Sequence, residues 1–181
     1  MKRLRPAMLA ALAVASCAGA LVACGSAPPV TVTLHRLPLG GTAPGATAAP
    51  ALQLTLPAYL DRDALLVPAG AAGGSALVPL GEHRWAEPLA VGVARVLRHE
   101  LAARGLARPL RVELLAFEAT ADRRHVQLVA RWNAGDGNAA GGASLLAPVT
   151  GAGADALVAA HRAALAELAA RISAAATRPP G

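Results

Sequence analysis

The stretch PLRVELLAFEATADRRHVQLVARWN, residues 109–133, holds the two strongest strand patterns of the chain. In its second half, one face consists of Val126, Leu128, Ala130 and Trp132. This alternation has the period of a half-buried strand, and the polar segment Thr120–Arg123 before it favours a turn. We therefore predict that Pro109–Glu118 and His125–Asn133 form an antiparallel hairpin around which the other elements are arranged.

Further strands are predicted on both sides of this hairpin. The glycine-rich segment Gly135–Gly142 favours another turn, after which Ala143–Val149 returns as the third strand of a meander. In the N-terminal half, the segments VTVTL and LQLTL alternate with the period of half-buried strands, and two short apolar runs flank the glycine-rich turn AGAAGGS. These four predicted strands are Val30–Leu34, Leu52–Leu56, Ala64–Val67 and Ala76–Leu80.

Two helices are predicted from apolar residues at helical spacing. The first has a stripe of Leu89, Val93, Val96, Leu97 and Leu101, and the second has a stripe of Leu157, His161, Leu165, Leu168 and Ile172. We expect Pro88 in the first turn of the first helix, Gly105 just after its end, and Asp155 as the cap of the second. The pattern predicts an α/β protein, more specifically an α+β two-layer domain, with a mixed, largely antiparallel sheet and both amphipathic helices packed on it.

The N-terminus has the layout of a bacterial export signal. Three basic residues within positions 1–6 precede an uncharged apolar run over positions 7–23. The sequence LVAC at Leu21–Cys24 resembles a lipobox, in which the cysteine sulfur is acylated and the chain is cut just before it. Cys17 follows a looser match, but more apolar sequence comes after it, whereas the polar tether GSAPP follows Cys24. We favour lipidation at Cys24 over lipidation at Cys17, and both over a soluble secreted product or an uncleaved membrane anchor.

The chain is expected to have four parts: residues 1–23 as the signal peptide; 24–50 as the lipidated tether, a first short strand and a flexible loop; 51–176 as the folded domain; and 177–181 as a disordered tail. Loss of the signal leaves 14 of the 17 Lys and Arg residues against 11 Asp and Glu, a balance of +3. The basic residues form no stripe or cluster along the sequence, so nucleic acid is not an expected partner.

The spacing of the polar residues along the sequence indicates neither a catalytic site nor a metal-binding site. The five histidines are not paired at ligand spacing, and Ser75 and Ser144 lack the glycine pattern of a nucleophile elbow. AGAAGGS lacks the spacing of a phosphate loop, and Asp136–Asn138 lacks the further carboxylates of a calcium loop. We therefore expect neither an enzyme nor a metal or cofactor site apart from the covalent lipid. His161 is expected to be buried with a backbone partner.

Four blocks of the sequence resemble the PqiC family of ABC-type transport auxiliary lipoproteins. They are LPAYLDR at Leu56–Arg62, RWAEPL at Arg84–Leu89, the strand pair LLAFEA and VQLVARW, and LVAAHRAALAELAARI at Leu157–Ile172. The resemblance implies a lipoprotein at the periplasmic face of the outer membrane. It also implies a partner, an MCE-domain membrane protein of a Pqi-like system that moves lipids between the two membranes and supports envelope integrity, and it is compatible with a homo-oligomer.

The family resemblance assigns roles to particular residues. It makes Cys24 the lipid attachment site and gives a motif, structural or partner-facing, that consists of Trp85, Glu87, Pro88, Leu89, Phe117 and Trp132. For the two tryptophans we favour core packing over stacking on a ligand. Glu87 is explained by its position at the start of a helix, where the dipole favours an acid.

Two functions of different classes remain open. The chain is either a non-enzymatic subunit that docks a transport machine at the outer membrane, or a lipid-binding module that holds a hydrophobic ligand between its sheet and its helices. A periplasmic hydrolase is disfavoured because the sequence shows no nucleophile with a matching base.

Overall fold

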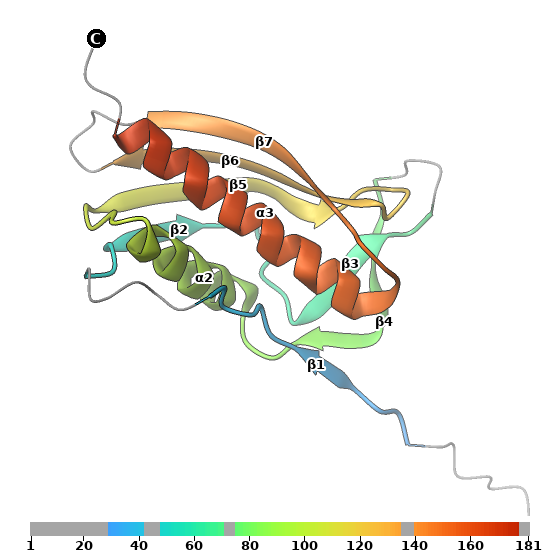
Figure 1. Cartoon of the computed structure of the whole chain (residues 1–181). Coiled ribbons are helices and arrows are strands. Elements are labelled where there is room, and N and C mark those ends of the chain that lie inside the picture. The colour runs from blue at the N-terminus through green and yellow to red at the C-terminus, as the bar shows by residue number, and fades with distance from the viewer. Residues whose placement is uncertain (1–28, 42–47, 71–74, 135–139, 178–181) are drawn as a thin grey trace, which may run out of the picture. The chain divides into compact units, whose positions relative to one another are not determined.

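The structure is a computed structural model that describes residues 29–41, 48–70, 75–134 and 140–177 (Figure 1). The chain divides into two units, Met1–Thr31 and Val32–Gly181, and all helices and strands described below belong to the second. The predicted signal peptide, Cys17, Cys24 and the turn at Asp136–Asn138 lie outside the described residues.

The predicted meander forms most of a four-stranded sheet. Its strands are β2 (Leu52–Thr55), β5 (Leu110–Ala119), β6 (His125–Ala134) and β7 (Ala140–Pro148), in the order β2-β5-β6-β7. Strands β5, β6 and β7 pair antiparallel, which confirms the hairpin and the meander, whereas β2 pairs parallel with β5. The sheet is therefore mixed and largely antiparallel, as expected.

The remaining strands form a second, three-stranded sheet, a separation that the sequence did not indicate. It contains β1 (Thr33–His35), β4 (Leu77–Trp85) and β3 (Ala64–Pro68) in the order β1-β4-β3. Strands β3 and β4, which were predicted as short strands on either side of a glycine-rich turn, pair antiparallel, and β1 lies parallel to β4 at the edge. Strand β4 is longer than expected because it continues to Trp85.

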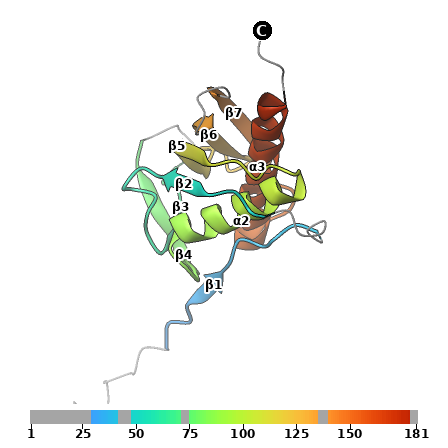
Figure 2. The same ribbon diagram turned by 90° about the vertical axis from the view of Figure 1, so that its left-hand side faces the viewer.

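Helices α2 (Leu89–Ala103) and α3 (Gly153–Ala176) lie on one side of the four-stranded sheet and contact each other (Figure 2). The α+β architecture is thus confirmed. Pro88 is the N-cap of α2 and does not lie in its first turn. Gly105 follows the helix with a φ of +75°, as a C′ glycine does. Asp155 does not cap α3, because the helix begins two residues earlier and Ala152 occupies the N-cap position.

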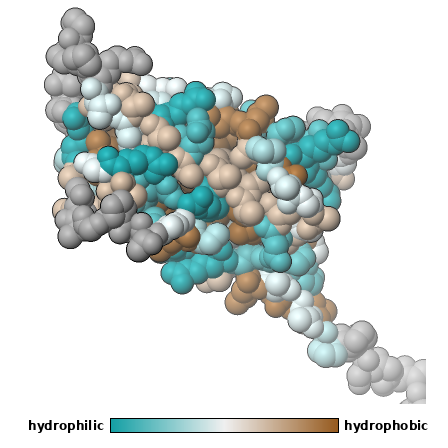
Figure 3. All heavy atoms as spheres, in the orientation of Figure 1, coloured by the Kyte–Doolittle hydropathy of each residue, from teal (hydrophilic) through white to brown (hydrophobic). Residues whose placement is uncertain are grey.

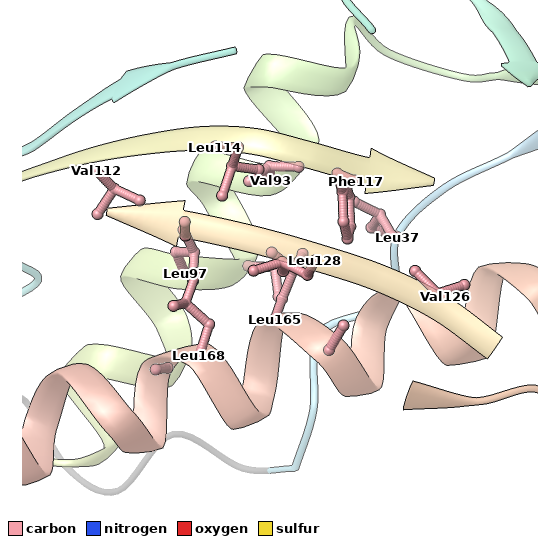
Figure 4. Close-up of a cluster of buried hydrophobic side chains, with 14 of the residues drawn as sticks. Leu37, Val93, Leu97, Val112, Leu114, Phe117, Val126, Leu128, Leu165 and Leu168 are labelled. Carbon is pink, nitrogen blue, oxygen red and sulfur yellow. The ribbon is translucent and has the colours of Figure 1, made fainter. Parts of the chain in front are cut away.

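The core lies between the two helices and the four-stranded sheet (Figure 4). Every residue of the two predicted helix stripes is buried. A bulge at Leu115 shifts the pairing of β5 with β6 between Leu114 and Ala116. As a result, Leu114 and Phe117, three positions apart, both reach the core.

Candidate functional site

The predicted motif residues Trp85, Leu89 and Phe117 form one buried cluster around His161. The imidazole of His161 meets both aromatic rings edge-on, with centroids 5.7 Å from Trp85 and 4.8 Å from Phe117. The space left among these side chains is only about 10 Å³, about enough for one water molecule. These motif residues therefore fill the core where the end of β4 meets β5 and α3.

His161 is held neutral in this cluster. Its Nδ1 donates a hydrogen bond to the carbonyl oxygen of Leu157, at 2.8 Å, one turn earlier in α3. Burial lowers the pKa of His161 from 6.5 to about 4, although the hydrogen bond opposes this shift. The expectation of a buried histidine with a backbone partner is confirmed.

Trp132 lies in a different part of the core. It is 7% exposed and stands opposite Gly141 of β7 in the sheet register. A Cβ atom added at Gly141 would lie only 2.5 Å from the indole Cζ2, so the ring occupies the space above that glycine. Core packing is thus confirmed for both tryptophans, and they do not form a joint stacking platform.

Glu87 has a more specific role than the predicted interaction with a helix dipole. Its carboxylate accepts a hydrogen bond from Arg95 in the second turn of α2, and Arg36 approaches the same oxygen at 3.5 Å. The Arg95 hydrogen bond is the main reason that the pKa of Glu87 is lowered. Arg95 also donates to the carbonyl oxygen of Leu37, at 2.9 Å. Glu87 and Arg95 therefore fasten the segment after β1 to α2.

The same segment is fastened again at Gly40. His99 of α2 bonds the Gly40 carbonyl oxygen at 2.6 Å. Beside it, the buried carboxylate of Glu100 accepts hydrogen bonds from Arg104 and Arg162, each at 2.6 Å. A Cβ atom at Gly40 would overlap the Nη2 atom of Arg162, so glycine leaves room for the Arg162 guanidinium beside the backbone here.

A chain of three polar side chains, which the sequence did not suggest, fixes the end of β1. The buried His35 places its Nε2 2.9 Å from Nδ1 of His83 on β4, and its Nδ1 3.3 Å from the carboxylate of Asp155 on α3. The two imidazoles thus bond to each other. In the part of the chain that the structure describes, no group of three His, Cys, Asp or Glu side chains is placed to hold a metal ion.

The outer face of β1 contradicts the expected burial of the VTVTL segment. Val32 and Leu34 are 49% and 64% exposed, whereas His35 points inward. The physical reason is that β1 is an edge strand whose inward position is taken by the polar chain with His83 and Asp155. The strand also begins later than predicted, at Thr33.

A hollow lies at the end of the four-stranded sheet, where β2 and β5 begin and β6 ends. It has a volume of about 700 Å³ and contains the side chains of Arg98 and Arg111 but no carboxylate among its described lining residues. A neighbouring hollow of about 340 Å³ shares Arg111 and adds Glu113 and Arg131. This groove could not be foreseen from the sequence, because its residues come from three strands and a helix.

Tyr59 of the LPAYLDR block lines a third hollow, of about 630 Å³, together with Glu118 of β5. Burial, and then the nearby Glu118 carboxylate, raise the pKa of Tyr59 to about 12. The phenol is therefore a neutral hydrogen-bond donor.

Among the helices of the described ranges, none has the length and apolar character needed to cross a membrane.

Comparisons with known proteins give a matching family and structures of similar fold. The sequence profile of the family described as "ABC-type transport auxiliary lipoprotein component" matches residues 34–173. The structure is similar to the crystal structure of an uncharacterized protein, with a TM-score of 0.66 and 18% identity over 81% of this chain and 99% of that one. It is also similar to a Xanthomonas campestris protein of the family DUF330, with a TM-score of 0.59 and 15% identity over 78% and 93% of the two chains. No curated protein matches the sequence.

Proposed function

Because the chain belongs to the family of ABC-type transport auxiliary lipoproteins, we propose that it is the outer-membrane lipoprotein of an MCE-type, Pqi-like transport system. In this role it has no catalytic activity of its own. It docks the periplasm-spanning component of the system at the outer membrane. It thereby supports lipid transport between the membranes and the integrity of the envelope.

The filled core is the observation that favours docking over carrying. A pocket for a ligand of lipid size needs several hundred Å³, roughly 300–1,000 Å³ in known sites. The space beside Phe117 and His161 is about 10 Å³, and the apolar residues between sheet and helices are almost completely buried. The domain as described therefore offers no room for an acyl chain between its sheet and its helices.

The proposed lipid anchor also favours docking over carrying lipid. Lipidation at Cys24 leaves only the five residues Gly25–Pro29 before Val30, which span roughly 18 Å when extended. Two or more acyl chains make such an attachment effectively permanent. Gly25 takes the place of the aspartate that is associated with retention in the inner membrane. A domain held this close to the outer membrane receives the end of a conduit but does not cross the periplasm.

For the surface that meets the partner, we favour the groove at the end of the four-stranded sheet. Arg98 donates one hydrogen bond to the carbonyl oxygen of Leu52, and Arg111 has no ion pair within the described residues. Two guanidinium groups beside apolar side chains suit a partner segment that combines a carboxylate with aliphatic residues. The docking surface proposed is thus a cationic groove for an acidic segment of the MCE-domain protein.

Co-purification from detergent-solubilised cells tests this surface. The lipoprotein is co-expressed with the MCE-domain protein of its own transport system, and the amount of captured partner is measured. Arg111→Glu is expected to reduce capture at least tenfold, whereas Arg62→Glu, an exposed charge reversal outside the groove, leaves it unchanged. Equal capture by both variants would contradict the groove as the docking surface.

The alternative function, a lipid-binding module, is favoured by one observation, the volume of the same groove. Native mass spectrometry of the domain from Ser26 onward, purified without detergent, distinguishes the two functions. Co-purifying phospholipid supports the binding module. An empty domain that captures the MCE-domain protein supports the docking subunit.

A further inference from the structure

Strand β1 and the residue before it, Val32, expose apolar side chains at the end of the domain that is nearest in sequence to the proposed lipid anchor. Val32 and Leu34 point outward, and brown, strongly apolar spheres mark this end of the domain in Figure 3. Val30, in the preceding unit, is also exposed, so the apolar alternation begins six residues after Cys24. Exposed apolar side chains that gather on one face can mark a surface that another surface covers.

Two arginines flank these apolar side chains. Arg84 of β4 is paired with Leu34 in the sheet register, so the two residues share a face; the Arg84 side chain is 24% exposed, and its guanidinium also bonds the Gly81 and His83 carbonyl oxygens and the Glu82 carboxylate. Arg36 follows Leu34 by two positions, and its side chain is largely exposed. Aliphatic side chains bordered by guanidinium groups match a lipid–water interface, where the apolar atoms enter the acyl boundary and the cations remain among the phosphates.

We propose that this face, formed by Val32, Leu34, Arg36 and Arg84 and here named the outer β1 face, rests on the bilayer that holds the lipid of Cys24. The inference depends on the proposed lipid anchor. Val32 is eight positions after Cys24, so the face lies within roughly 29 Å of the anchor point even on a fully extended chain. The bilayer is thus the surface that the outer β1 face meets most often.

Two aliphatic side chains are too few to recruit a free protein to a membrane. A protein that is already anchored needs only a weak additional contact to rest on the membrane surface. A short flexible tether gives its two ends an effective concentration in the millimolar range, so even a weak contact is populated. The contact also sets the orientation of the domain. Because the bonds of His35 and Glu87 join β1 and the segment after it to the helices, resting β1 on the membrane fixes the direction in which the rest of the domain faces.

Tryptophan scanning of the mature lipidated protein in vesicles tests this inference. The vesicles contain phosphatidylethanolamine and phosphatidylglycerol with brominated acyl chains, which quench tryptophan fluorescence at short range. Leu34→Trp and, as a second variant, Val32→Trp place the probe on the outer β1 face. Leu146→Trp is the matched control, because Leu146 is 61% exposed on β7, which lies on the other side of the domain from β1 (Figure 1). Trp85 and Trp132 are buried and give a constant background.

We expect blue-shifted, quenched emission from both β1 variants and unquenched emission from Leu146→Trp. Equal quenching at all three positions, or at none of them in a protein whose intact mass shows the acyl chains, overturns the inference and leaves the anchor intact. A blue shift without quenching, together with cross-linked dimers, shows that a second copy covers the face and also overturns it. A protein without acyl chains that does not stay with the vesicles contradicts the anchor and the inference together.

Discussion

The imidazole of His161 stands edge-on against the ring of Phe117, with the two planes at 82°. Phe117 comes from the part of β5 that follows the bulge, and His161 comes from the first half of α3. Trp85 closes the same cluster from the end of β4. A single ionisable group therefore lies at the point where the two sheets and α3 meet, and its protonation is coupled to the stability of the whole domain.

His161 should make the domain acid-sensitive. Its pKa is about 4 in the folded protein, against 6.5 for a histidine in water, so the unfolded chain binds a proton first as the pH falls. The free energy of unfolding should therefore decrease between about pH 6.5 and pH 4, by on the order of 3 kcal/mol in total. Urea unfolding at several pH values measures the slope.

The variant His161→Leu should show a much smaller slope over the same pH range, whatever its absolute stability. His125→Gln, at a half-buried position in β6, is the matched control and should keep the wild-type slope. A His161→Leu protein with the same pH dependence as the wild type would mean that another group is responsible.

Gly40→Ala should release Arg162 from Glu100, because the added methyl group would occupy the position of the Arg162 guanidinium. Loss of this charged hydrogen bond should lower the free energy of unfolding by about 1.5 to 3 kcal/mol. Gly70→Ala is the control, since no atom lies near its Cβ position. In a double-mutant cycle, Gly40→Ala should cost less in an Arg162→Ala background, where only the contact of the added Cβ with Glu100 Oε1, at 2.7 Å, remains, and simple additivity would contradict this account.

Trp132→Ala should lower the free energy of unfolding by on the order of 3 to 5 kcal/mol, because it removes a large buried ring. Gly141→Ala should cost roughly 1 to 3 kcal/mol through overpacking against that ring, and Gly142→Ala should cost less. Denaturant midpoints measure all three. A midpoint unchanged in Trp132→Ala would show that the ring does not pack in the core.

Cys24→Ser should block processing and leave a larger precursor in the inner membrane, because an acylated cysteine is needed before cleavage. Cys17→Ser should be processed as the wild type is. The intact mass of the mature protein gives the answer, and a mature chain that starts at Cys17 would contradict the assignment of Cys24.

The elements that were predictable from the sequence are those with a clear local period. The alternation in β6 and the helical stripe from Leu157 to Ile172 each bury one face, so a pattern along the chain is enough to reveal them. The bulge in β5 was not predictable, because the residues LLAF at 114–117 are apolar on both faces and give no break in the pattern. The second sheet was also missed, since the pairing of β1 with β4 depends on contacts between distant segments.

Contacts between distant segments also limited what could be predicted about the candidate site. Trp85, Leu89, Phe117 and Trp132 were singled out by the family resemblance, and the structure places all four in the core. His35, His83 and Asp155 lie far apart along the chain, and the groove around Arg98 and Arg111 is assembled from separate elements. Only tertiary structure brings such residues together, so local spacing held no signal for them.

The central proposal is that the domain acts while fixed to the outer membrane. The most direct measurement expresses it from a soluble export signal, without Cys24, in a strain that lacks the native copy, and compares the detergent sensitivity of the envelope with that of a strain carrying the lipidated form. Equal periplasmic amounts of the two proteins are verified by immunoblot. The proposal predicts that only the lipidated form restores resistance. Full restoration by the unanchored domain would contradict a docking role at the membrane.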